Sequence, residues 1–162
     1  MARSSEKRNV EEGKPPERRS MLELRLPSDE RYLHMVRELA RRLAESTGFA
    51  PAEAEEIALA VDEATTNVIK HAYHGAKDRE IDIHFDPEGE SLNIQIFHDG
   101  DPLNEVHLPD FDLKEMVAKR RRGGLGVHIM KTMMDRVHYG KAGSGKNVCV
   151  MIRYKQPGTD SD

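Results

Sequence analysis

The chain has 162 residues, a formal net charge of −4, and 33% charged residues. A length of this order favours one domain that buries its own core. The negative net charge removes the broad basic field that recruits nucleic acid, so we expect no direct nucleic-acid binding. The single cysteine, Cys149, excludes an internal disulfide, and no apolar run reaches the roughly 20 residues that span a bilayer. These features predict a cytoplasmic protein with no membrane segment.

The two ends of the chain differ in composition from its middle. Residues 1–20 mix charges of both signs with Pro15 and Pro16, and Val10 is their one large aliphatic residue after Met1. Such a segment buries too little apolar surface to offset the entropy of ordering it, so we expect a flexible tail. Residues 156–162 have the same character. The predicted domain therefore covers residues 21–155.

Hydrophobic periodicity predicts the first three elements of this domain. Leucines alternate with polar residues over 22–26, which indicates a strand. Ser28 offers an N-cap oxygen for a helix that extends to about Gly48. A second helix is expected from Pro51, a residue suited to a first turn, to about Tyr73.

The second half of the chain is richer in strand patterns. Strands near 80–86 and 91–98 are separated by the turn residues 86–89, which predicts an antiparallel hairpin. After a long irregular segment, a third helix and two further strands are expected at 125–135, 136–141 and 147–154. Three helices and about five strands predict an α+β fold, with helices layered over one face of a mixed, mostly antiparallel sheet.

Three polar residues on the second helix, Glu63, Asn67 and His71, follow one another at a spacing of four. At 100° per residue they lie along one edge of the apolar arc of that helix. A carboxylate in such a stripe can accept a proton from an attacking hydroxyl, and an amide oxygen suits Mg²⁺. An ordinary polar flank of an amphipathic helix has the same spacing, so the spacing alone leaves both interpretations open.

A glycine-rich run, Arg121-Arg122-Gly123-Gly124-Leu125-Gly126-Val127, precedes the third helix. Glycine lets backbone N–H groups approach an anion, and a helix N-terminus favours negative charge. The run therefore predicts a phosphate cradle, although a glycine hinge beside solvated arginines explains it equally well. A second run, residues 140–147, lacks the hydroxyl residue of a P-loop and leads into a strand, so we expect no phosphate site there.

Taken in order, these motifs resemble those of the GHKL ATPase superfamily, and specifically the anti-sigma factor serine kinases of the RsbW and SpoIIAB type. Residues 63–73 are similar to the N box of that family, residues 100–104 to the end of its G1 box, and residues 124–131 to its G2 box. Residues 145–151 are similar to its closing strand motif. The resemblance covers about residues 21–155 and implies a two-layer α/β sandwich, the Bergerat ATP-binding fold.

The resemblance also implies roles for individual residues. Glu63 would be the general base, and Asn67 would hold the Mg²⁺ that accompanies ATP. The residues expected to contact the nucleotide are Asn67, His71, His98, Asp99, Gly100, Arg122, Gly123, Gly124, Leu125, Gly126, Val127 and Asn147. The segment from about Leu108 to Gly123 would form a lid over the ATP, and Tyr73 would shape the edge of the pocket.

The implied activity is transfer of phosphate from Mg-ATP to a serine of a STAS-type anti-anti-sigma protein. The implied competing partner is a sigma factor, which would make the protein a regulator of transcription, and the implied assembly is a homodimer. Two alternatives share the fold: a non-catalytic or weakly ATP-binding anti-sigma or adaptor protein, and an ATPase that needs no partner.

One position departs from the family pattern. Two residues before the G1 glycine, the family carries an aspartate that accepts a hydrogen bond from the adenine amino group, whereas this chain has His98, followed by Asp99. Neutral His98 can accept that bond through a ring nitrogen. Alternatively, a one-residue shift brings Asp99 into place, or nucleotide affinity is low and the domain acts mainly as a binder. The sequence leaves these three alternatives open.

Overall fold

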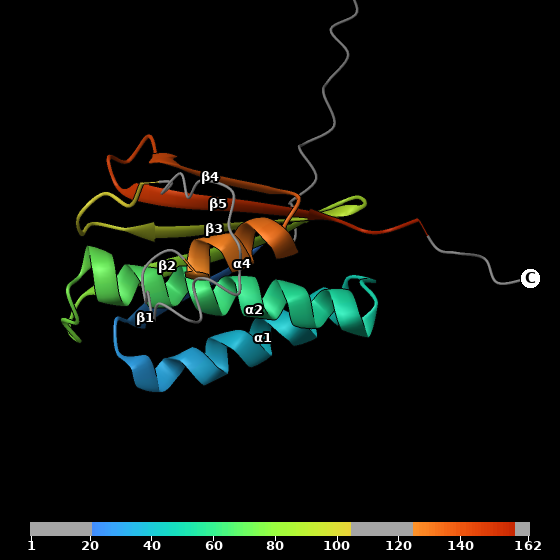
Figure 1. Cartoon of the computed structure of the whole chain (residues 1–162), viewed down its shortest axis with the longest axis horizontal. Coiled ribbons are helices and arrows are strands. Elements are labelled where there is room, and N and C mark those ends of the chain that lie inside the picture. The colour runs from blue at the N-terminus through green and yellow to red at the C-terminus, as the bar shows by residue number, and fades with distance from the viewer. Residues whose placement is uncertain (1–20, 105–124, 158–162) are drawn as a thin grey trace, which may run out of the picture.

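The computed structural model describes residues 21–104 and 125–157, and these residues form one sheet with helices on one of its faces (Figure 1). The strands are β1 (Leu22–Pro27), β2 (Glu80–Glu88), β3 (Ser91–His98), β4 (Arg136–Lys141) and β5 (Asn147–Tyr154). The helices are α1 (Leu33–Ser46), α2 (Pro51–Asn67) and α4 (Leu125–Met133), with the short helices η1 (Glu30–Tyr32) and η2 (Val68–Ala72). None of these helices has the length and hydropathy of a membrane-spanning segment.

The five strands are ordered β1-β2-β3-β5-β4, and each neighbouring pair is antiparallel. The predicted α+β architecture is therefore confirmed, but the expectation of a mixed sheet is wrong for the described strands. The reason is the last hairpin. The chain leaves β3, passes through α4 and enters β4 in the same direction as β3; β5 then returns between these two strands and separates them.

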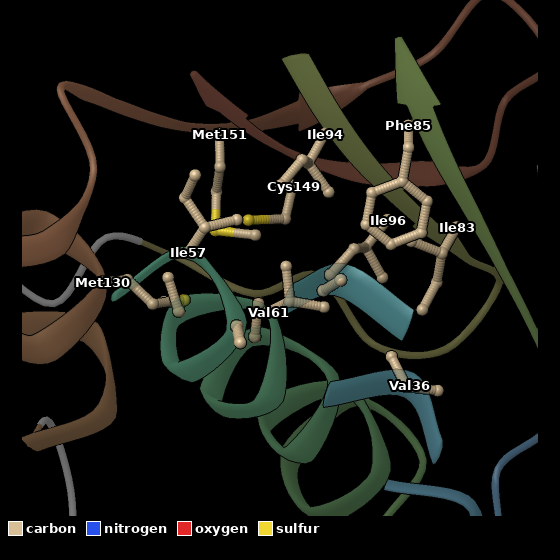
Figure 2. Close-up of a cluster of buried hydrophobic side chains, with 14 of the residues drawn as sticks. Val36, Ile57, Val61, Ile83, Phe85, Ile94, Ile96, Met130, Cys149 and Met151 are labelled. Carbon is tan, nitrogen blue, oxygen red and sulfur yellow. The ribbon is translucent and has the colours of Figure 1, made fainter. Parts of the chain in front are cut away.

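The core lies between the sheet and α2, which packs between α1 and α4 (Figure 1). The apolar arc predicted for the second helix, which runs from α2 into the first residue of η2, is confirmed, because its members are at most 2% exposed: Ile57, Ala60, Val61, Ala64 and Val68. They pack against buried side chains of the sheet, as Figure 2 shows for Ile83, Phe85, Ile94, Ile96, Cys149 and Met151. Burying one large aliphatic side chain stabilises the fold by about 1.5–3 kcal/mol, so this interface holds α2 firmly in place.

Ser28 does not cap the first helix as predicted. Asp29 is the N-cap of η1, and its Oδ1 accepts a hydrogen bond from the backbone N–H of Arg31 at 3.0 Å. The hydroxyl of Ser28 instead donates to the carbonyl of Ala76 and accepts from the backbone N–H of Arg79 at 3.1 Å. Ser28 makes these bonds because β1 pairs with β2, and this pairing places the segment before β2 next to Ser28.

The turn of the first hairpin also lies further along the chain than predicted. Strand β2 continues through Asp86 and Pro87, and Glu88 is the last residue that pairs with β3, opposite Ser91. The two-residue loop begins at Gly89, whose φ of 57° costs little for glycine alone. The backbone reversal therefore falls where a positive φ is tolerated and not at the proline.

Candidate functional site

Glu63 and Asn67, one turn apart on α2, both face the first turn of α4. A Cβ atom built on Gly126 would lie 2.7 Å from Glu63 Oε2, 3.5 Å from Asn67 Oδ1 and 3.6 Å from Asn67 Nδ2. The first distance is shorter than a real contact of a Cβ atom, so a glycine at this position lets the carboxylate lie where it does. The structure thus brings together two residues of the predicted polar stripe and one residue of the predicted phosphate cradle.

The carboxyl group of Glu63 is half-buried, and this environment disfavours its ionised form relative to a carboxyl group in water. Burial raises the pKa of Glu63 above its ordinary value, and the adjacent negative charge of Asp62 raises it further. Lys70 and Arg37 act in the opposite direction without cancelling the effect. A carboxylate with a raised pKa is a stronger proton acceptor, which suits a general base.

The predicted stripe ends at Asn67, because the helix changes its geometry there. Residues Val68–Ala72 form a π-helix, closed by a hydrogen bond from the N–H of Tyr73 to the carbonyl of Val68 at 2.9 Å. A π turn holds more residues than an α turn, so the spacing that placed His71 above Asn67 does not apply. His71 is exposed. No signal in the sequence distinguishes a π turn from a continued α-helix.

His98, the last residue of β3, is buried on the helix-covered side of the sheet and only 2% exposed. The edge of its ring meets the ring of Tyr73, with 5.9 Å between centroids. Burial lowers the pKa of His98, so the imidazole is neutral at physiological pH. Its Nδ1 atom is buried and has no hydrogen-bond partner among the residues that the structure describes.

The side chain of Asp99, the next residue, lies at the surface, whereas that of His98 is buried. Its carboxylate accepts hydrogen bonds from Arg79 Nη2 at 2.9 Å and from the Tyr73 hydroxyl at 3.0 Å, and its side chain is 58% exposed. The Arg79 guanidinium and the Tyr73 hydroxyl hold the pKa of Asp99 below its usual range. Of the two residues considered as the base-recognising group, His98 is the buried one, and Asp99 is paired at the surface.

Gly100 lies against the end of η2. A Cβ atom there would approach Ala72 O to 2.5 Å and Tyr73 Cδ1 to 2.7 Å, so this position accepts only glycine without a backbone shift. The chain is held in place by hydrogen bonds from Asp101 N to Ala72 O at 3.0 Å and from Asn147 Nδ2 to Gly100 O at 2.8 Å. Asn147 is also the register partner of His98 in the sheet. The G1-like and closing-strand motifs therefore meet here.

An open pocket of about 360 Å³ adjoins Asn147. Its lining comes from the segment after β3, from β4 and from the first residue of β5: Pro102, Leu103, Asn104, His138, Tyr139, Gly140, Lys141 and Asn147. The volume falls in the range of small-molecule sites. Sequence reasoning missed Tyr139, which no motif marks, and Lys141, which lies in the run 140–147 where no phosphate site was expected. Both reach the pocket because β4 pairs beside β5.

Several predictions concern residues outside the described ranges. These are the tail at residues 1–20, the last residues of the C-terminal tail, the lid from about Leu108 to Gly123, and the nucleotide contacts assigned to Arg122, Gly123 and Gly124. The side chain of Leu125 is also outside the description. Val127, on α4, is 9% exposed and belongs to the core.

Comparison with known proteins agrees with this arrangement. The sequence profile of the histidine kinase-like ATPase domain matches residues 26–153. The serine-protein kinase RsbW of Bacillus subtilis (strain 168) is 30% identical over 120 residues, which cover 72% of this chain and 75% of that protein. The RsbW of Bacillus pumilus (strain SAFR-032) is 28% identical over 148 residues, covering 88% of this chain and 91% of the relative.

Among solved structures, the crystal structure of the RsbU and RsbW domains of Rv1364c from Mycobacterium tuberculosis superposes with a TM-score of 0.54 and 15% identity. The match covers 88% of this chain and 35% of that longer chain, and it supports the fold. The chain belongs to the family of histidine kinase-like ATPase domains, the GHKL superfamily, and within it to the RsbW type of serine-protein kinase.

Proposed function

We propose that the protein is a serine protein kinase that transfers the terminal phosphate of Mg-ATP to a serine of a partner protein. The observation that carries the proposal is the approach of Glu63 and Asn67 to Gly126, with 2.7 Å between Glu63 Oε2 and a Cβ built on the glycine. An acid, an amide and a glycine of the first turn of a helix then lie side by side. Such a set can hold a polyphosphate and activate a hydroxyl beside it.

The residues of the site have complementary roles in this proposal. Bound Mg-ATP supplies the phosphoryl group and the positive charge that phosphoryl transfer needs. Glu63 accepts the proton of the attacking serine hydroxyl, and its burial favours this because it raises the pKa of the carboxyl group. Asn67 offers an amide oxygen, a ligand that suits Mg²⁺. The N–H groups at the start of α4, around Leu125, Gly126 and Val127, face the phosphate oxygens.

The base of the nucleotide would lie at the end of β3. His98 supports this assignment, since its Nδ1 is a buried polar atom without a partner among the described residues. Gly100 and Asn147, which are linked by a hydrogen bond of 2.8 Å, form the adjoining wall. His71 and Asp99 lie on the exposed rim, and Arg122, Gly123 and Gly124 complete the proposed set from the run that precedes α4.

The proposed partners follow from the RsbW relatives, each of which is named a serine-protein kinase. The acceptor serine would belong to an anti-anti-sigma protein of the STAS type. A sigma factor would bind the kinase in competition, so that phosphorylation controls transcription in the cytoplasm. We propose a homodimer as the active assembly.

A second function is favoured by one observation. His98 stands where the family carries an aspartate, and this change supports a non-catalytic adaptor that binds ATP weakly or not at all. The two functions differ in what they require of Glu63. A kinase needs the carboxylate for transfer, whereas an adaptor needs only the shape of the surface.

The test uses the full chain, a candidate STAS protein and radiolabelled Mg-ATP. We expect phosphoserine on the partner with the wild-type chain and with Glu55→Gln, which makes the same change on an exposed part of α2. Glu63→Gln should still bind Mg-ATP, measured by calorimetry, and lose transfer by roughly 100-fold or more, at the lower end of general-base contributions. ATP binding without transfer to any partner would support the adaptor, and phosphate release without a partner would support a free ATPase.

A further inference from the structure

The buried imidazole of His98 offers a hydrogen-bonding atom that the described residues do not use. The side chain is 2% exposed, and its Nδ1 has no partner in the described part of the chain. Buried polar side-chain atoms are nearly always hydrogen-bonded in folded proteins, and those that are not need an explanation. A ligand that enters at the end of β3 and completes the bond provides one.

Two polar side chains beside His98, those of Tyr73 and Asn147, form hydrogen bonds with other groups. The hydroxyl of Tyr73, whose ring meets His98 edge-on, donates to the carbonyl of Glu80 and contacts the carboxylate of Asp99. The side-chain amide of Asn147, opposite His98 in the sheet, donates to the carbonyl of Gly100 at 2.8 Å. Neither group is directed to the imidazole, so the bonding capacity of Nδ1 remains for a ligand.

The chemistry of an imidazole at this point differs from that of a carboxylate. An ionised carboxylate only accepts hydrogen bonds, so it pairs with an amino group and rejects a carbonyl oxygen. A neutral imidazole has one donor and one acceptor nitrogen, and exchange of its tautomer turns Nδ1 from one into the other. Because burial lowers the pKa of His98, the neutral form prevails at physiological pH.

Resting on the proposed nucleotide-binding function, we propose that His98 makes the base pocket accept purine nucleoside triphosphates with either an amino or an oxo group at carbon 6. With an amino group, Nδ1 accepts a hydrogen bond. With an oxo group, Nδ1 carries the proton and donates. A carboxylate at the same place would discriminate between the two bases because its lone pairs would face the lone pairs of the oxygen.

The test compares Mg-ATP with Mg-ITP, two nucleotides whose bases differ at carbon 6, with the adjacent ring nitrogen protonated in ITP. Their dissociation constants are measured by calorimetry on the full-length wild-type chain, His98→Asp and His98→Asn. We expect the wild-type constants to agree within about fivefold, less than the tenfold that corresponds to one good interaction. His98→Asp should favour ATP by at least about tenfold, because an unmatched buried polar group is costly.

His98→Asn is the matched control, since its amide can present either its NH₂ group or its oxygen and should keep the two constants within about fivefold. Circular dichroism shows whether each variant is folded. If His98→Asp does not fold, the comparison of the wild type with His98→Asn still tests the inference. A wild-type preference for ATP above about tenfold, or an Asn variant that selects ATP, overturns the inference while nucleotide binding stands. If the wild type binds neither nucleotide, the proposed function and the inference fail together.

Discussion

Glu63 and Gly126 are packed so closely that the glycine cannot gain a side chain without moving the carboxylate. The nearest oxygen, Oε2, lies 2.7 Å from where a Cβ would stand, and the amide of Asn67 lies behind it at 3.5 Å or more. The first turn of α4 and the end of α2 are therefore matched in shape at the proposed catalytic point. The contact joins residues 63 positions apart in the sequence, and it can be tested by substitution.

Gly126→Ala should impair phosphate transfer while leaving the fold intact. The added methyl group pushes Glu63 out of position, so we expect the transfer rate to fall by about 10-fold to 100-fold, as a misplacement near 1 Å can do. The unfolding free energy should change by less than about 1 kcal/mol, because alanine favours a helix. Transfer kinetics and urea unfolding measure the two effects. Gly143→Ala is the control, since a Cβ there would meet nothing within 4 Å.

The burial of Glu63 predicts a pH dependence of stability. Because the folded-state pKa of Glu63 is raised, the folded protein binds this proton more tightly than the unfolded chain does. Its contribution to stability is thus full below the ordinary value of 4.5 and is lost as the pH rises through the raised pKa. Glu63→Gln should therefore be more stable than the wild type at pH 7, by about 1 kcal/mol at most, because solvent screens part of the effect at a half-buried carboxyl group.

The gain of Glu63→Gln should disappear near pH 4, where the wild-type carboxyl group is also neutral. Urea unfolding at the two pH values measures the difference. Glu55→Gln, a change at an exposed residue, should show no such gain at pH 7. A Glu63→Gln variant less stable than the wild type at pH 7 would contradict the account of a carboxylate destabilised by burial.

Gly100→Ala should destabilise the whole domain. The added carbon would stand 2.5 Å from the carbonyl oxygen of Ala72 and 2.7 Å from the ring of Tyr73, and the first of these contacts is with backbone. We expect a loss of about 1–3 kcal/mol, the usual cost of overpacking. Thermal unfolding measures it, again with Gly143→Ala as control. An unchanged melting temperature would mean that the segment after β3 can move away freely.

Arg153 should contribute more to stability than its ion pair alone. It is 9% exposed, and it donates to the carbonyl of Met133 at 2.7 Å and to Glu56 Oε2 at 2.8 Å. These bonds connect β5 to the last residue of α4 and to the N-terminal half of α2. Arg153→Met leaves the carbonyl of Met133 without this donor, so we expect a loss of about 1–3 kcal/mol. Glu56→Gln removes only a partly exposed charge and should cost less than about 1 kcal/mol. Equal losses of unfolding free energy for Arg153→Met and Glu56→Gln, measured by denaturant unfolding, would contradict this prediction.

Local patterns were sufficient for most of the secondary structure. The alternation at 22–26 and the apolar arc of α2 correspond to β1 and to the buried face of a helix, because side-chain direction follows directly from the period of each element. The same geometry placed Glu63 and Asn67 on one edge of α2, and the glycines before residue 127 predicted the start of α4. The resemblance to the GHKL family, which the comparisons confirm, rests on those same motifs.

Other features could not be predicted from the local patterns of the sequence. His71 leaves the stripe because η2 is a π turn, and Ser28 caps no helix because β2 brings Ala76 and Arg79 within its reach. The direction of Asp99 is set by Arg79, and the burial of His98 by the helices that cover β3.

The sequence by itself determined on which elements the proposed site residues lie, because the periods of helices and strands can be read from the order of apolar and polar residues. Only the tertiary structure decided which of them meet. The distance between Glu63 and Gly126 follows from how α2 and α4 pack on the same sheet. That packing depends on the complete sheet, in which strands from distant parts of the chain are paired.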